Sequence, residues 1–88
     1  MHTNIDNSTT ARIKKVIVDY AELDCDIAQL HLDDDLFTIG MSSRASVNLM
    51  IGLESEFDIE FPDEMLRKEV FESVRAIGNA IELLTEKI

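Results

Sequence analysis

Apolar residues recur every three or four positions in three separate stretches of this 88-residue chain. That spacing gathers them on one face of an α-helix, whereas a half-buried β-strand needs an apolar residue at every second position. The apolar spacing therefore predicts long helices over residues 9–22, from 42 or 43 to 57, and 73–84. A brief alternation over residues 58–61 is too short for an independent strand, so we expect an extended linker there.

A fourth, shorter helix is predicted over residues 63–70. Pro62 suits the entry to a helix because its φ is already fixed near the helical value, and Asp63 and Glu64 suit the positive end of the helix dipole. Ser73 is the expected N-cap of the last helix. Helices with one apolar face must bury that face against each other. We therefore predict an all-α fold, a four-helix bundle of three longer helices and one short helix.

The chain length allows one small domain, because a chain of this size buries only about 60–65% of the surface that it exposes when unfolded. Residues 1–7 are polar and have little to bury, so they are predicted to form a flexible N-terminal segment. Residues 8–88 are predicted to form the folded domain.

Eighteen acidic residues oppose eight basic ones, which gives a formal net charge of −10. Such a chain repels phosphate backbones and anionic lipid heads, so we expect no nucleic acid and no membrane among its partners. No stretch approaches the roughly 18 consecutive apolar residues of a membrane helix. The single cysteine, Cys25, cannot form an internal disulfide, which fits a reducing compartment. We expect a cytoplasmic protein that works as a monomer.

The connection over residues 24–40 is long for a compact domain and carries three consecutive acids at residues 33–35. A calcium-binding EF-hand loop needs Gly at its sixth position and Glu at its twelfth. Counted from Asp33, those positions hold Thr38 and Arg44. We interpret the acids as a solvated turn that caps a short helix.

No arrangement of side chains predicts bond-making chemistry by the chain itself. The imidazole bases available are His2 and His31, and neither belongs to a recognisable nucleophile–base arrangement. Cys25 and His31 together give two candidate metal ligands, fewer than the usual three or four. We predict neither a metal site nor an enzyme.

Ser43 is placed for covalent modification. It follows the flexible Gly40 and stands at the start of a predicted helix, where its hydroxyl points outward and the unpaired backbone N–H groups favour an attached anion. Ser42 competes with it for the role of N-cap. By itself, this placement favours a serine that only caps the helix, because most serines at such positions are caps.

Two longer segments resemble those of a known family. Residues 34–43, with the sequence DDLFTIGMSS, resemble the signature of acyl and peptidyl carrier proteins. Residues 53–64 look like the end of that family's second helix and the link into its third, and residues 74–77 fit its last helix. The matches extend from about residue 13 to 84, in the family's order and at nearly its spacing.

This resemblance implies that Ser43 carries 4′-phosphopantetheine, transferred from coenzyme A by a phosphopantetheinyl transferase. The thiol at the end of the arm would hold a cargo as a thioester and deliver it to other proteins. Tethering raises the effective concentration of the cargo at a docked partner, so the carrier can bind weakly and exchange rapidly. Residues 8–88 are then the carrier domain.

The sequence departs from fatty-acid carriers beside the attachment site. Those carriers usually have Asp before the serine and Leu after it, where this chain has Ser42 and Arg44. The predicted second helix is also less acidic, and residues 65–72, which border the place of the arm, form a slightly longer stretch that contains Arg67 and Lys68. Because charge complementarity governs partner choice, these departures favour different partners.

The segment from Gly40 to Arg44 looks most like small free-standing carriers that receive amino acids from ligases resembling class II aminoacyl-tRNA synthetases. The resemblance therefore implies an amino acid:carrier-protein ligase as partner. Acyl-processing enzymes of fatty-acid or polyketide chemistry are the alternative, and an unmodified acidic helical docking module is a third reading. The residues predicted to contact partners are Met41, Ser42, Arg44, Val47, Asn48 and Ile51.

Overall fold

The computed structural model describes residues 7–21, 23 and 29–85 and contains no strand within those ranges. Its long helices are α1 (Asn7–Val16), which continues as the π-helix η1 (Ile17–Ala21), α3 (Ser43–Phe57) and α5 (Val74–Thr85). Its short elements are α2 (Leu36–Ile39), the 3₁₀ helix η3 (Asp63–Met65) and α4 (Lys68–Phe71). The all-α prediction, with three longer helices, is confirmed. Helix α1 begins at Asn7, the last residue of the predicted N-terminal segment, and residues 1–6 of that segment lie outside the described ranges.

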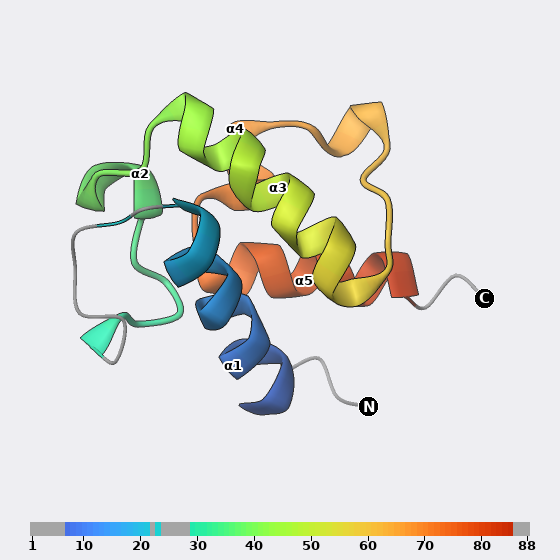
Figure 1. Cartoon of the computed structure of the whole chain (residues 1–88), viewed down its shortest axis with the longest axis horizontal. Helices are drawn as coiled ribbons and strands as arrows, with labels where there is room; N and C mark the ends of the chain where they lie inside the picture. The colour runs from blue at the N-terminus through green and yellow to red at the C-terminus, as the bar shows by residue number, and fades with distance from the viewer. Residues whose placement is uncertain (1–6, 22, 24–28, 86–88) are drawn as a thin grey trace.

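The core lies where α1, α3 and α5 meet, with α3 crossing α5 and α1 packed against both (Figure 1). Each of these helices contributes one apolar face, as the spacing predicted. The largest fully buried side chains are Ile13, Ile17, Leu36, Leu49, Leu53, Val74 and Ile77. The described part of the chain has no helix long and apolar enough to cross a membrane.

The predicted helix over residues 63–70 is wrong in its continuity. The chain instead forms η3, then an extended residue at Arg67 (φ −132°, ψ 153°), and only then α4. The break allows Phe71 to enter the core, where its ring meets Phe61 edge-to-face with a centroid distance of 5.2 Å, while Leu66 stays exposed. Packing of an aromatic pair outweighs the local tendency to continue one helix.

The short helix α2 is held by its caps. The Asp35 carboxylate accepts hydrogen bonds from the backbone N–H groups of Phe37 and Thr38, so the predicted acidic turn that caps a short helix is confirmed. Gly40 ends the helix at φ 137°, a conformation that L side chains rarely adopt, and its N–H donates to the carbonyls of Leu36 and Phe37. At the other end of the domain, the Ser73 hydroxyl accepts from the N–H of Ala76, which confirms the predicted cap of α5.

The π-helix η1 changes which residues of the first helix are buried. In a regular α-helix Tyr20, three residues after Ile17, would share its buried face, but Tyr20 is 39% exposed and Ala21 is buried instead. A π-helix closes its hydrogen bonds over five residues rather than four, so the wider turn carries Ala21, not Tyr20, onto the face of Ile17. The Tyr20 ring then lies over Gly52 of α3.

We expect Gly52→Ala to destabilise the domain by about 1 kcal/mol. This is the opposite of what helix propensity alone would give, because alanine stabilises a helix by up to about 1 kcal/mol relative to glycine. A Cβ at position 52 would lie 2.6 Å from Cδ1 and 2.8 Å from Cγ of Tyr20, too close to the root of the ring to be relieved by a small rotation. Urea unfolding measures the effect. In a Tyr20→Ala background the same substitution should stabilise; a destabilisation there as well would show that the ring is not the obstacle.

The loop before α2 is tied to α5 by Arg75. Its Nε and Nη2 lie 2.7 and 3.3 Å from the two carboxylate oxygens of Asp33, and its backbone N–H donates to the carbonyl of Leu32. The hydrogen bond from Arg75 holds the pKa of Asp33 below its ordinary value of 3.8; desolvation opposes this shift, and the charge of Arg75 adds to it.

Because the folded-state pKa of Asp33 is lowered, the ion pair stabilises the fold above the ordinary carboxyl pKa and is lost as the pH falls through the lower, folded-state value. We expect Asp33→Asn to be less stable than the wild type at about pH 6, with a difference that shrinks toward about pH 3. Urea unfolding across this range measures it. A difference that is independent of pH would contradict the assignment.

Candidate functional site

Two neighbouring serines at the start of α3 have different roles. Ser42 is the N-cap: its backbone is extended (φ −81°, ψ 166°) and its Oγ accepts a hydrogen bond of 3.0 Å from the N–H of Ala45. Ser43 is the first helical residue and is exposed, and its hydroxyl makes no hydrogen bond within the described part of the chain. The sequence left open which serine caps the helix; the structure assigns the cap to Ser42 and leaves the Ser43 hydroxyl free.

The segment that leads into α3 is anchored to α2 and to the core by Met41. The Met41 N–H donates to the carbonyl of Leu36 at 2.9 Å, and the Met41 side chain is 3% exposed. The prediction of Met41 as a partner-binding residue is therefore corrected: its side chain lies in the core, out of reach of a docked protein. Its physical role is to fix where Ser42 and Ser43 stand.

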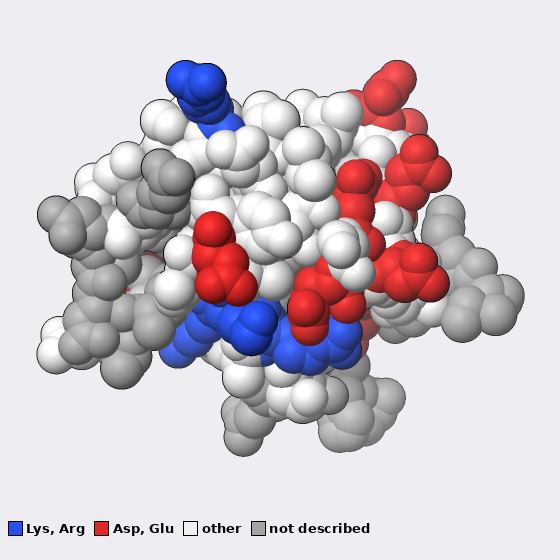
Figure 2. Space-filling view, in the orientation of Figure 1, with Lys and Arg blue, Asp and Glu red and all other residues white. Residues whose placement is uncertain are grey.

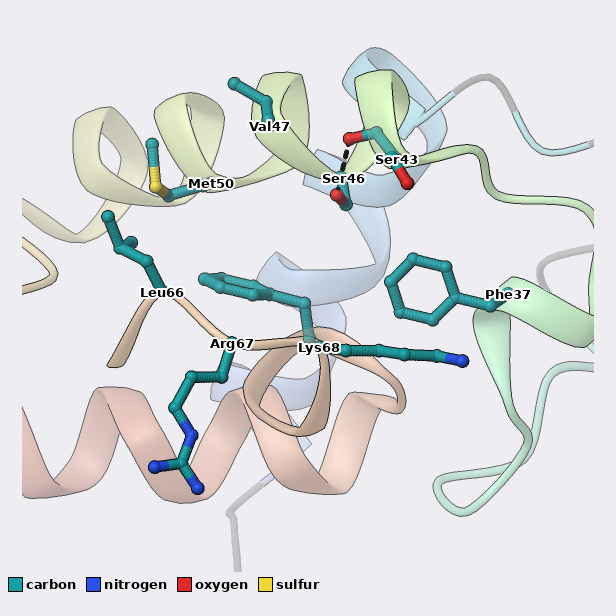
Figure 3. Close-up of a pocket in the computed structure, with 9 residues that line it drawn as sticks. Phe37, Ser43, Ser46, Val47, Met50, Leu66, Arg67 and Lys68 are labelled. Atoms are coloured by element: carbon teal, nitrogen blue, oxygen red, sulfur yellow. Dashed lines mark hydrogen bonds between the residues drawn. The ribbon is translucent and has the colours of Figure 1, made fainter. Parts of the chain in front are cut away.

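Beside Ser43 the structure has a cavity of about 480 Å³ between α3 and the segment that contains η3 and α4. Ser43 and Phe37 lie at one end, and Met50 and Leu66 lie at the other (Figure 3). The Ser46 hydroxyl donates to the Ser43 carbonyl at 2.6 Å, and the Ser43 side chain points toward the Phe37 end of the cavity (Figure 3). The residues that line the cavity are Phe37, Ser43, Ser46, Val47, Met50, Leu66, Arg67, Lys68 and Phe71.

The exposed face of α3 carries little charge in its first turns. Arg44 is the one basic residue of this helix, and Val47 and Ile51 are each 52% exposed one turn apart. Figure 2 shows a largely uncharged surface there and acidic side chains gathered toward the C-terminal end of α3 and the segment after it. Of the residues predicted to contact partners, the five other than Met41 are exposed on or beside this helix: Ser42, Arg44, Val47, Asn48 and Ile51.

The acidic side chains near α2 do not converge on one point. Asp33 pairs with Arg75, Asp34 accepts from the backbone N–H of His31 at 2.9 Å, and Asp35 caps α2. Within the described ranges, no three His, Cys, Asp or Glu side chains are grouped to hold a metal ion. The Cys25 of the pair considered with His31 lies outside those ranges.

Phe37 is a site residue that the sequence did not identify, and Lys68 was recognised only as a base in a stretch that borders the place of the arm. Lys68 begins α4 and Phe37 belongs to α2, yet the Lys68 ammonium lies 5.2 Å from the centroid of the Phe37 ring at the end of the cavity near Ser43. The usable signal was the pair of bases at residues 67 and 68 in an otherwise acidic stretch.

Comparison with known protein families identifies the class of domain to which this helical fold belongs. A family model described as a phosphopantetheine attachment site matches residues 11–81, and the chain belongs to that family of carrier domains. Among its relatives, the aminoacyl carrier protein of Agrobacterium fabrum is 37% identical over 76 residues, covering 86% of this chain and 92% of the relative. An acyl carrier protein of Caulobacter vibrioides is 31% identical over 78 residues, covering 86% and 90%.

A solved structure is similar over nearly the same range. It is a crystal structure of an engineered Bradyrhizobium japonicum glycine:[carrier protein] ligase in complex with a carrier protein from Agrobacterium tumefaciens and ATP. One of its chains matches with a TM-score of 0.84 and 37% identity, covering 86% of this chain and 99% of that chain. The carrier family and the fold expected from the sequence are thereby confirmed.

Proposed function

We propose that this chain is an aminoacyl carrier protein in which Ser43 bears 4′-phosphopantetheine and a separate ATP-dependent ligase loads an amino acid. The observation that carries the proposal is the exposed hydroxyl of Ser43, which makes no hydrogen bond to any described residue, while its neighbour Ser42 caps α3. When bound, the group supplies a terminal thiol on a flexible arm, and this thiol holds the cargo as a thioester.

The attachment step is a phosphoryl transfer to the Ser43 oxygen. Oγ loses its proton and bonds to the phosphorus that carries the pantetheine, and the pyrophosphate bond of coenzyme A breaks, with adenosine 3′,5′-bisphosphate as leaving group. The chain contributes a positioned, unshielded nucleophile, because Met41 is anchored in the core and the α3 cap is supplied by Ser42. A transferase supplies the base and the binding site for coenzyme A.

An amino acid is the cargo that the observations support best. The aminoacyl relative is more similar to this chain than the acyl relative is, at 37% against 31% identity, and the similar solved structure holds a glycine:[carrier protein] ligase. An aminoacyl thioester carries a free ammonium group, which is costly to bury without a partner. Such a cargo stays outside the core. The apolar side chains of the cavity, Val47, Met50, Leu66 and Phe71, support a fatty acyl cargo as the second candidate.

We further propose that the transferase and the ligase dock on the exposed face of α3. Val47 and Ile51 offer an apolar centre next to Ser43, with Ser42, Arg44 and Asn48 around it. Apolar anchors surrounded by polar residues are the usual composition of a specific interface. The bond-making groups belong to these partners, so the chain is a carrier and not an enzyme. Their use of coenzyme A and ATP supports a cytoplasmic location.

Stepwise intact-mass measurement tests the proposal. Incubation with coenzyme A and a broad-specificity transferase should add the mass of one phosphopantetheine. Further incubation with ATP, glycine and a glycine:[carrier protein] ligase should add one glycyl group that hydroxylamine removes. Loading only by fatty-acyl ligases would replace the aminoacyl assignment with the acyl one. No gain in the first step would contradict both and favour an unmodified docking module.

A further inference from the structure

Among the residues that the structure describes, Lys68 is a cavity-lining cation without an acidic partner. It lines the same cavity as Ser43, and its ammonium rests 5.2 Å from the centroid of the Phe37 ring. Among the described residues it forms no ion pair, although the chain has 18 acids for 8 bases. In so acidic a chain, an unpaired lysine beside the proposed attachment site is free to receive an anion.

The other two cations near Ser43 are placed differently. The Arg67 side chain points away from α3, and its Nε lies 4.0 Å from Glu69 Oε1 (Figure 3). Arg44 is next to Ser43 in sequence, but it is not among the residues that line the cavity. Lys68 is therefore the cavity-lining cation that has no ion pair in the described part of the chain. Its side chain runs along the Phe37 ring, so it reaches a group on Ser43 by rotation about its side-chain bonds (Figure 3).

We propose that Lys68 binds the phosphodiester that joins Ser43 to the arm, and so fixes the side from which the arm leaves the domain. This inference rests on the proposed attachment at Ser43. The phosphodiester adds a negative charge to a chain whose net charge is already −10, so a nearby cation lowers the cost of carrying it. The flexible stem and three donors of a lysine suit it to an anion that it can reach by rotation about its side-chain bonds.

The consequence for function concerns access to α3. An arm held at its root by Lys68 leaves over the cavity, which Val47 borders, and not over Ile51, which does not line the cavity and belongs to the proposed docking face. A partner can then settle on α3 without first displacing the arm. Lys68 acts as a positioning residue, since the bond-making chemistry takes place at the far end of the arm.

The test compares unmodified and fully modified forms of wild type, Lys68→Gln and Arg67→Gln, with the extent of modification read by intact mass. Arg67→Gln is the matched control, because it removes the same charge from the adjacent residue. At low salt, the change in urea midpoint on modification should be more positive in the wild type than in Lys68→Gln. At least half of the wild-type change should be lost in Lys68→Gln and retained in Arg67→Gln. The ³¹P resonance of the phosphodiester should move in Lys68→Gln and stay in place in Arg67→Gln.

Salt gives a second test that needs no substitution. Because the Debye length falls from about 10 Å at 0.1 M to about 3 Å at 1 M salt, the contribution of an exposed ion pair to the wild-type change should decrease as salt is added.

Lys68→Arg, which keeps the charge, should retain most of the effect of modification on the urea midpoint. Equal midpoint changes and equal ³¹P shifts in wild type and Lys68→Gln would overturn the inference alone. Absence of any mass gain in the wild type would instead overturn the proposed function, and this inference with it.

Discussion

Ser43→Ala should abolish the transfer of phosphopantetheine, while Ser42→Ala should still accept one equivalent. The two serines are adjacent, but only the Ser43 hydroxyl is free, because the Ser42 Oγ accepts a hydrogen bond from the N–H of Ala45. Intact mass after incubation with coenzyme A and a transferase measures the result. Both variants keep the same number of remaining serines in this segment, so they are matched in composition.

Stability separates the same two variants in the opposite sense. Ser42→Ala removes the N-cap of α3 and should cost about 1 kcal/mol of unfolding free energy. Ser43→Ala removes an exposed hydroxyl that makes no hydrogen bond to the residues the structure describes, and it should change stability by no more than about 0.5 kcal/mol. Urea unfolding of the unmodified proteins measures both. Undiminished transfer to Ser43→Ala, or its loss in a folded Ser42→Ala, would contradict the assigned roles.

Ile51→Asp should lower kcat/KM for loading by the ligase about tenfold or more. Ile51 is 52% exposed at the proposed docking face, and loss of an apolar anchor from the centre of an interface costs more than about 1.4 kcal/mol, which corresponds to a factor of ten. The new carboxylate adds a second penalty, because it must lose its water when a partner covers it. Single-turnover loading of the modified carrier at low carrier concentration measures the change.

Leu83→Asp is the control for this experiment. Leu83 is as exposed as Ile51, at 54%, but it belongs to α5. The two substitutions introduce the same charge and remove similar apolar surface, so they should have similar small effects on folding. Equal losses of loading in both variants would mean that net charge governs the reaction, and α3 would not be the docking face.

The long helices were predictable because their information is local. The apolar spacing of α3 and α5 and the hydroxyl at Ser73 specify those elements within a dozen neighbouring residues. The acidic turn at Asp35 was predictable for the same reason, since an N-cap bonds to backbone groups two and three residues away. The order of these features along the chain was also enough to indicate the family.

The features that sequence reasoning missed depend on contacts between distant residues. The break before α4 follows from the packing of Phe71 on Phe61. The burial of Ala21 in place of Tyr20 follows from the π-helix η1, which packs against α3. Met41 stands beside the two serines in sequence, which suggested an exposed residue, but its side chain is buried in the folded domain. The placement of Lys68 near Ser43 requires α2, α3 and α4 to be assembled around one cavity.

The most direct test of the central claim is to locate the attached group within the wild-type chain. After modification, fragmentation mass spectrometry that preserves the phosphodiester assigns the added mass to one residue between Met41 and Val47. We predict that all of it lies on Ser43. The added mass on Ser42 or Ser46, or outside this segment, would contradict the account.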